Sequence, residues 1–382
     1  MSRKHDSKKT VNGHRTSGRF LFAAVSVMIL TAAVCTAVWL AVRDTPAKAV
    51  RSTMKQISSL DESALRQIVE AEDGVRDSDA AIPALSLFFE KFSCRVVSVS
   101  KNEDYADVLV RVKTPDARAL ASDIRLLLLK DSGLTQAADH QEAPDHQIVP
   151  DTALVYSLME QCLSEREYPL TETEGSVRVD KTQDGWSLIR TSDLSSLLLG
   201  GFPDALADPW LLAPDTVLTV FLEKLDSASA EEWAVIFDVN DLFSTYAANA
   251  AQIDMEFLTR AGEAFSWSDL KADTSGSHAD VSLTITGIDT GAILQNCKEK
   301  LASYGKTADA ATADSYDVSS KSASLLLESI RENESTAEFP VTVSMENDGT
   351  GWSITDSSAL TDACFGGMLA AVEEFSSEDT EN

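Results

Sequence analysis

The chain has 382 residues, in which 61 Asp and Glu outnumber 32 Lys and Arg, so its formal net charge is −29 at pH 7. A surface with this excess of negative charge repels nucleic acids and other anionic polymers, and we expect no nucleic-acid partner. The simplest interpretation is that the acidic side chains keep an exposed domain soluble. They would also attract basic envelope proteins or peptides.

The first feature along the chain is an apolar run at residues 20–42, which contains no charged side chain. As a helix, this run would rise roughly 35 Å, enough to cross a hydrocarbon core of about 30 Å. Trp39 lies near its end, where an indole prefers the boundary between lipid and water. The tail before it, residues 1–19, carries six Lys or Arg and one Asp, and short basic flanks stay in the cytoplasm. We therefore predict a single-pass membrane protein with a cytoplasmic N-terminus and extracytoplasmic C-terminal domains.

Two processing signals near this run point to other outcomes. Ala47-Lys48-Ala49 has the small-x-small form of a signal-peptidase site, at which cleavage would leave Val50 as the first residue. The apolar run is much longer than the core of a usual signal peptide, which favours an uncleaved anchor. Cys35 could carry a lipid, but Val34 precedes it where a small residue is required. The predicted anchor is therefore the helix itself.

The part of the chain beyond the apolar run contains two copies of one pattern. In the first copy, Phe92-Ser93 is followed fourteen residues after the serine by Asp107, and apolar residues then alternate with polar ones. In the second copy, Phe265-Ser266 is followed at the same distance by Asp280 and a similar alternation. Alternation at period two is typical of a strand with one buried face, so we predict the same strand in both copies.

The ends of the two copies match as well. Gly185-Trp186-Ser187-Leu188 corresponds to Gly351-Trp352-Ser353-Ile354, and a leucine stands eight residues beyond each tryptophan. A glycine pair then begins fourteen residues beyond each tryptophan, as Gly200-Gly201 and Gly366-Gly367. Glycines in this place suit the left-handed end of a helix. Matching features at fixed offsets indicate an internal duplication.

The spacing of apolar residues predicts similar elements in each copy. Helices come first, because apolar residues recur at helical spacing in both copies. In the first copy these residues are Met54, Ile57, Leu60, Leu65, Ile68 and Val69, and in the second Val217, Phe221, Leu222 and Leu225. In the first copy, strands at Cys94–Val99 and through Asp107 are followed by helices at about 117–130 and 151–165. A hairpin signal at Asp184-Gly185 joins two closing strands, and a short helix ends at the glycine pair.

The remaining segments are predicted to be connections. Residues 131–150 are polar and without periodicity, which is typical of a loop, and the prolines around 204–213 suit a linker. The predicted domains are thus residues 48–203 and 214–372. Five of the last ten residues, 373–382, are acidic, and we predict a disordered tail there.

Helices followed by an antiparallel sheet that further helices interrupt indicate an α+β fold. The Asp-Gly-Trp-Ser hairpin at Asp184, followed by a leucine-bearing helix and two glycines, resembles the end of a cystatin-like domain. That family shares the curved-sheet cone of nuclear-transport-factor-like domains and occurs in bacterial envelope proteins and lipoproteins. The resemblance implies two repeated cystatin-like domains, each with helices packed on a curved antiparallel sheet. It implies no function, because the fold serves enzymes, ligand binders and spacers alike.

Four residues are the most tempting candidates for a site inside such a cone. Trp186 and Trp352 could line a ligand pocket, but a tryptophan that follows a turn and starts an apolar alternation is usually core, and we predict that both are buried. Asp107 and Asp280 could act as the acids of an isomerase. Because each stands next to a buried-face position, we expect both carboxylates to point toward solvent.

Other candidates for chemistry are weaker. His140 and His146 could hold a metal with neighbouring acids, but their spacing in a polar loop matches no ligand pattern. The four cysteines beyond the apolar run allow disulfides or are small buried apolar side chains, and both interpretations stay open. They are Cys94, Cys162, Cys297 and Cys364. We predict no catalytic, cofactor-binding or metal-binding residue, since no nucleophile elbow or phosphate-binding loop is present.

The function that the sequence favours is non-enzymatic: an anchored, extracytoplasmic protein of the bacterial cell envelope whose two domains bind a partner or act as a spacer. The alternative is a hydrolase or isomerase that uses one cone as its active site. An enzyme should have converging polar groups with shifted pKa values deep in one cone. A binder or spacer should have cones that are filled by apolar side chains.

Overall fold

A computed structural model of the protein describes residues 45–70, 78–131, 152–183, 185–189, 191–239, 242–243 and 250–378. The predicted anchor at 20–42, the basic tail before it and nearly all of the predicted loop at 131–150 lie outside these residues. In the described part of the chain, no helix is both long and apolar enough to cross a membrane. The chain forms two compact units, Met1–Pro115 with Leu170–Gly200 and Asp116–Pro169 with Gly201–Asn382.

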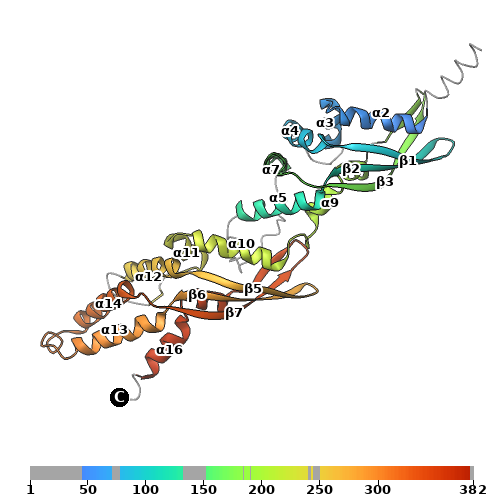
Figure 1. Cartoon of the computed structure of the whole chain (residues 1–382). Helices are drawn as coiled ribbons and strands as arrows, with labels where there is room; N and C mark the ends of the chain where they lie inside the picture. Colours follow the sequence, from blue (N-terminus) through green and yellow to red (C-terminus); the bar gives the residue numbers. More distant parts are fainter. Residues whose placement is uncertain are drawn as a thin grey trace, which may run out of the picture. The chain divides into compact units, whose positions relative to one another are not determined.

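The first unit is an antiparallel sheet of four strands in chain order, with helices before and after it. Its strands are β1 (Ser93–Lys101), β2 (Tyr105–Pro115), β3 (Leu170–Thr182) and β4 (Gly185–Leu188). Its helices are α2 (Pro46–Ser58), α3 (Glu62–Glu70), α4 (Ser78–Phe89) and α8 (Ser192–Leu198). Figure 1 shows α2, α3 and α4 along one face of this sheet, and α2 contacts all four strands.

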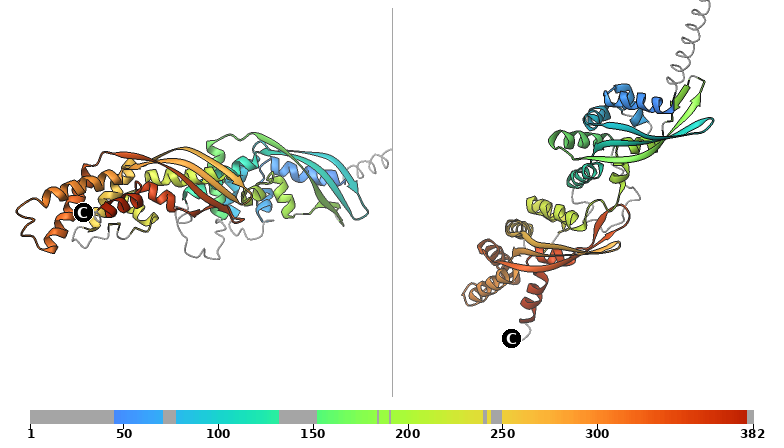
Figure 2. Two further views of the ribbon diagram at one scale, coloured as in Figure 1. Left: turned by 90° about the horizontal axis from the view of Figure 1, so that it is seen from below. Right: turned by 45° about the vertical axis from the view of Figure 1, so that its right-hand side comes forward.

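The second unit contains the other sheet, again of four antiparallel strands in chain order. Its strands are β5 (Ser266–Ser275), β6 (His278–Ile288), β7 (Thr336–Asn347) and β8 (Trp352–Asp356). Its helices are α5 (Ala117–Asp131), α7 (Thr152–Glu165), α9 (Phe202–Ala207), α10 (Pro214–Ser227), α11 (Ala230–Ile236), α12 (Ala250–Ala264), α13 (Thr290–Tyr304), α14 (Ser315–Glu332), α15 (Ser358–Cys364) and α16 (Met368–Glu378). Two turned views show the long, curved strands of both sheets (Figure 2).

The alternation in the sequence produces one buried and one more exposed face on each sheet. In β2 the side chains of Ala106, Val108, Val110 and Val112 are fully buried, while those between them are half-buried. In β6 the buried set is Ala279, Val281, Leu283 and Ile285, each at most 3% exposed. Successive residues of a strand point to opposite faces, so the alternation of apolar and polar residues determines which face of each sheet the helices cover. The predicted α+β class with antiparallel sheets is confirmed.

The duplication in the sequence corresponds to a repeated order of elements. Among the described elements, three helices, two strands, two helices, two strands and two helices follow one another from α2 to α9 and again from α10 to α16. Strand register repeats as well: Trp186 pairs with Lys181 and Trp352 with Asn347, each partner being the twelfth residue of its long strand. The first strand of each sheet has a register shift, which ends at Ser98 in β1 and at Lys271 in β5.

The glycine pairs close a helix in both copies, as the sequence predicts. Helix α8 ends at Leu198 and α15 ends at Cys364. The following glycines have φ angles of +64° and +81° in the first pair and +67° and +68° in the second. These values lie in the left-handed region, which glycine enters without the steric cost that a Cβ brings.

Three details of the structure differ from the prediction. Leu60 is not part of the apolar helix face but lies in the turn after α2, with φ +56° and 38% of its surface exposed. The predicted linker at 204–213 is partly helical, since α9 extends to Ala207. Pro203 is compatible with this helix because it lies in the first turn, where a backbone N–H has no partner within the helix. The predicted disordered tail at 373–382 is helical up to residue 378 in α16, whose first turn Asp362 caps by accepting the N–H of Leu369 at 2.9 Å.

The compact units also differ from the predicted domains. The sequence places α5 and α7 in the first domain, residues 48–203, whereas in the structure they belong to the second unit. There α5 contacts α9 and α10, and α7 contacts α5. The predicted strands at Cys94–Val99 and through Asp107 correspond to β1 and β2, and the predicted helices at about 117–130 and 151–165 correspond to α5 and α7.

Candidate functional site

The buried face of the second sheet is filled by apolar side chains. Trp233 of α11 is fully buried at its centre, with Phe237 and Phe265 at ring distances of 5.3 and 5.5 Å. Its indole N–H donates to the carbonyl oxygen of Leu225 at 3.0 Å, so even the polar edge of the ring has a partner. Phe365 closes the cluster at 6.4 Å from Trp233. Apolar side chains therefore occupy the space in which an active site inside a cone would need converging polar groups.

The two tryptophans of the repeat differ in burial. Trp352 is 8% exposed and its ring meets that of Trp210 edge to face at 5.4 Å, so the predicted burial is confirmed there. Trp186 is only half-buried, with the Lys101 ammonium 5.1 Å from its ring, so the predicted burial is wrong there. In the second copy the covering ring, Trp210, stands four residues before the first residue of α10. The residue at the same spacing before α2 is Val42, which lies outside the described residues.

The two strand carboxylates lie on the more exposed face of their sheets. Asp280 is exposed and accepts a hydrogen bond from the Ser344 hydroxyl at 2.9 Å. Asp107 is half-buried and stands opposite Arg178 in the strand register. Both positions agree with the prediction that these carboxylates face away from the core.

The predicted histidines and cysteines form no common site among the described residues. His140 and His146 lie outside these residues, and in the described part no three His, Cys, Asp or Glu side chains gather where they could hold a metal ion. The four described cysteines are free thiols, and all except the half-buried Cys94 are buried. Burial raises the pKa of Cys94 to about 11 and raises that of Cys364 as well. These thiols are therefore protonated near neutral pH and are poor nucleophiles.

A polar junction that the sequence did not reveal is centred on Arg125 of α5. Its guanidinium donates one hydrogen bond to the carbonyl oxygen of Leu206 at 3.1 Å and another to that of Thr350 at 2.9 Å. Burial lowers the pKa of Arg125, and the negative charge of Asp208 partly offsets this effect. The sequence contained a signal for this residue: Arg125 is the only charged residue in the run 124–129, whose other residues are one isoleucine and four leucines.

The segment between α9 and α10 is held by further side chains of this junction. Asp208 accepts the backbone N–H of Trp210 at 2.9 Å and pairs with the Arg118 guanidinium at 2.8 Å. The hydrogen bond from the N–H of Trp210 and, to a smaller extent, the contact with Arg118 hold the pKa of Asp208 below its usual value. The buried Asn347 amide donates to the carbonyl oxygen of Pro209 at 2.8 Å. These polar groups are satisfied by structural contacts, so the junction positions backbone and does not present reactive groups.

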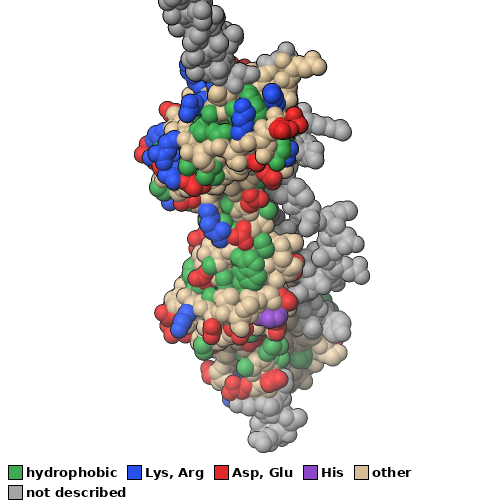
Figure 3. Space-filling model, turned by 90° about the vertical axis from the view of Figure 1, so that its right-hand side faces the viewer, with side chains coloured by type: hydrophobic (Ala, Val, Ile, Leu, Met, Phe, Trp, Pro, Cys, Tyr) green, Lys and Arg blue, Asp and Glu red, His purple; other side chains and the backbone are tan. Residues whose placement is uncertain are grey.

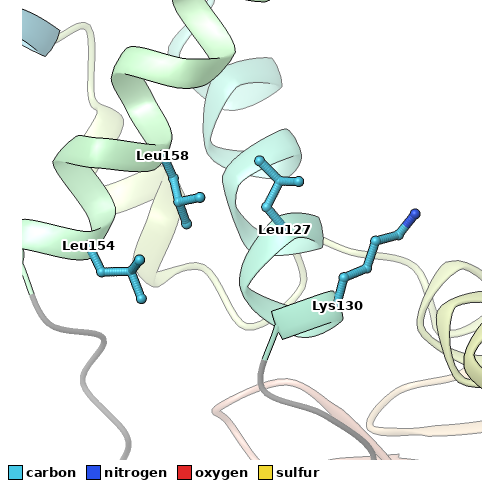
Figure 4. Close-up of a pocket in the computed structure, with 4 residues that line it drawn as sticks. All are labelled: Leu127, Lys130, Leu154 and Leu158. Atoms are coloured by element: carbon cyan, nitrogen blue, oxygen red, sulfur yellow. The ribbon is translucent and has the colours of Figure 1, made fainter.

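An open groove lies between α5 and α7, and we call it the α5–α7 groove. It is lined by Leu127, Lys130, Leu154 and Leu158 and has a volume of about 340 Å³. Figure 4 shows the leucine side chains of the two helices pointing into the space between them, with Lys130 at the end of α5. Leu154 is 38% exposed, and the Lys130 ammonium lies 3.2 Å from the Glu223 carboxylate.

The equivalent seam of the second copy is ionic. Leu127 and Lys300 are 173 residues apart, the same offset as between Asp107 and Asp280. The Lys300 ammonium bridges α13 to α14 by pairing with Glu328 at 2.9 Å and Glu332 at 2.7 Å. Charge thus ties the two helices of the second copy at a place where the first copy has the apolar Leu127.

A second polar cluster lies at the other end of α5 and α7. The Tyr168 hydroxyl donates to the Asp123 carboxylate at 2.6 Å, and the Arg166 guanidinium approaches the same oxygen at 2.7 Å. Burial and the hydrogen bond to Asp123 raise the pKa of Tyr168, which therefore stays protonated and serves as a donor. The cluster ties the chain after α7 to α5.

Comparison with known proteins adds little to this geometry. No protein-family model matches the chain, and no curated protein matches it. Among solved structures, a crystal structure of a candidate lipoprotein (ycdA) from Bacillus subtilis matches 72% of this chain and 95% of its own, with 12% sequence identity and a TM-score of 0.25. The cystatin-like assignment of the two copies stays a prediction.

Proposed function

We propose that the protein is a membrane-anchored, extracytoplasmic protein of the cell envelope that binds a partner through the α5–α7 groove and carries out no chemistry of its own. The anchor and its orientation rest on the uncharged run at 20–42 and the basic tail before it. The binding function rests on the groove.

The observation that carries the binding function is the contrast between the two helix seams. A duplication starts with two identical seams, and the one at Lys300 is closed by two ion pairs. At the place of Lys300 the first copy has the apolar Leu127, which lines a hollow between α5 and α7 together with Leu154, Leu158 and Lys130. Exposed apolar surface is costly for a protein in water unless a partner covers it, so this contrast favours a binding surface over a spacer.

The filled interior supports a function without catalysis. A hydrolase or isomerase would need a cavity behind the sheet into which acids or bases converge. In the second unit that volume is taken by Trp233, Phe257 and Phe365. The described charged side chains with shifted pKa values, such as Arg125 and Asp208, are engaged in the junction.

Site-specific photo-crosslinking in intact cells tests the groove. A photoreactive phenylalanine derivative at Leu154 is expected to give a discrete adduct of higher mass, because this side chain lines the groove and is 38% exposed. The same derivative at Val235, which is 79% exposed and not part of the groove, is the matched control and should give none. Leu158→Glu should reduce the adduct at position 154 about tenfold, since a buried carboxylate opposes apolar contact. Equal adducts from positions 154 and 235, or no adduct from 154, would contradict the binding function.

A further inference from the structure

Helix α2, the first described helix, has a basic face. Its buried side chains, Pro46, Val50, Met54 and Ile57, recur at helical spacing and pack on the first unit. The exposed side chains of Lys48, Arg51 and Lys55 follow the spacing i, i+3, i+7 and therefore form one stripe on the side away from the core. We call these three residues the basic stripe.

The basic stripe has no acidic neighbour along its own helix. Residues 45–60 contain three Lys or Arg and no Asp or Glu, in a chain where acids outnumber bases almost two to one. Among the described residues, none of the three forms an ion pair with an acid within 4.0 Å. Their positive charge is therefore directed to solvent.

The duplication provides a comparison helix without such a stripe. The buried residues of α10, Pro214, Leu218, Leu222 and Leu225, repeat the spacing of the buried residues of α2. At the same spacing, the places of the basic stripe are taken by Thr216, Thr219 and Glu223. Packing on the sheet thus does not require Lys or Arg at these places, and their presence in α2 needs another reason.

Charge is also divided unequally between the two units. Residues 45–115 and 170–200 contain 13 Lys or Arg and 16 Asp or Glu, whereas residues 116–169 and 201–382 contain 12 and 43. On the face drawn in Figure 3, Lys and Arg side chains gather on the first unit while Asp and Glu predominate on the second. An anionic surface would therefore attract the basic stripe and repel the second unit.

We propose that the basic stripe docks the first unit on the anionic phospholipid headgroups of the membrane in which the chain is anchored. This inference rests on the proposed anchor at 20–42. The chain from Val42 to Pro46 can span at most about 14 Å, so the first turn of α2 is held close to the lipid surface. At physiological salt, charges interact over about 8 Å, a range that Lys48 can reach from this tether.

The consequence of docking is a fixed orientation of the first unit. A tethered unit without the stripe would sample all orientations that its connection permits. Each Lys or Arg near an anionic surface strengthens attachment about fivefold, so three residues bias the orientation on the order of a hundredfold. The face of α2 that carries the stripe would then be covered by lipid headgroups, and the opposite side of the unit would face outward.

Environment-sensitive fluorescence on the full-length protein in lipid nanodiscs tests this proposal. A fluorophore on Ser52→Cys lies within the exposed face of α2, and the high pKa of the half-buried Cys94 and the burial of the other described thiols favour selective labelling. In nanodiscs with phosphatidylglycerol we expect at least a twofold rise in emission relative to phosphatidylcholine, and its loss in 0.5 M NaCl. The same label on Ser227→Cys, an exposed position at the end of α10, is the control and should not respond.

The variant Lys48→Gln/Arg51→Gln/Lys55→Gln separates charge from proximity. It keeps the helix, because glutamine is a good helix former, and it should abolish the response at position 52. Provided that the protein co-purifies with the discs, three results would overturn docking. The emission could respond equally in both lipids, it could respond in the triple variant as well, or it could fail to respond at all. Failure of the chain to stay with the discs would overturn the anchor itself, and with it the docking that depends on it.

Discussion

Trp233→Ala is expected to unfold the second unit at temperatures at which the wild-type protein is folded. The side chain is fully buried, and its ring contacts Phe237 and Phe265. Removing a buried aromatic ring costs about 3–5 kcal/mol through lost transfer energy and an unfilled cavity. The substitution also removes the donor to the Leu225 carbonyl, which loses its side-chain partner. Since a typical domain is stable by about 5–15 kcal/mol, this loss is a large part of the total.

Thermal unfolding of the full-length protein in detergent, followed by near-ultraviolet circular dichroism, measures the effect. Trp233→Phe should lie between wild type and Trp233→Ala, because it keeps an aromatic ring and loses only the N–H donor and some volume. Trp210→Ala is the matched control, since that ring is 47% exposed and its removal leaves no closed cavity. Equal melting temperatures for the two alanine variants would show that the second unit is not organised around Trp233.

Gly366→Ala is expected to disrupt the end of α15. At φ +67° an alanine is already strained, and its Cβ would lie 1.8 Å from the carbonyl oxygen of Ile288 and 2.9 Å from the Thr290 hydroxyl. Both neighbours are held in place, because Ile288 pairs with Thr336 in the sheet and the Thr290 hydroxyl donates to the carbonyl oxygen of Phe365 at 2.7 Å. The backbone must therefore shift, and we expect a loss above about 4 kcal/mol, the range of exceptional single substitutions.

Gly201→Ala separates this clash from backbone strain. Gly201 also has a positive φ, +81°, but a Cβ there would meet no atom within 4 Å. Its replacement should cost only the left-handed conformation of a non-glycine residue, about 1–2 kcal/mol. Chemical denaturation of both variants provides the comparison. A Gly366→Ala protein no less stable than Gly201→Ala would mean that Ile288 does not approach the helix end as closely as described.

Much of the fold could be predicted because it depends on patterns that are local in the sequence. The alternation that follows Asp107 and Asp280 marks the buried face of β2 and β6 without any knowledge of the partner strands. The glycine pairs mark helix ends because only a residue without a Cβ enters the left-handed region freely. The membership of α5 and α7 in the second unit could not be predicted, since it depends on contacts between helices that leave no periodic signal.

The junction and the groove were missed for a related reason. Arg125 binds carbonyl oxygens of Leu206 and Thr350, 81 and 225 residues away, and any residue type provides a carbonyl oxygen. The groove depends on Leu127, Leu154 and Leu158 staying partly exposed after folding, whereas the sequence shows only that they are apolar. Trp186 shows the same limit, because the sequence marks its strand position and does not show which side chains will cover it.

The anchor is the claim on which the proposed function and the docking of α2 both depend. In the structure Ala47-Lys48-Ala49, the signal-peptidase motif, forms the first turn of α2, and Val50 is fully buried. Cleavage before Val50 would remove the start of a packed helix, so the fold favours an intact chain.

Mass spectrometry of the membrane-bound protein, before and after protease is added to intact spheroplasts, tests this claim most directly. We expect an uncleaved chain before digestion. After digestion we expect loss of both units and retention in the membrane of a fragment that contains residues 1–42. A mature protein that begins at Val50, or units that the spheroplast membrane protects from protease, would contradict the account.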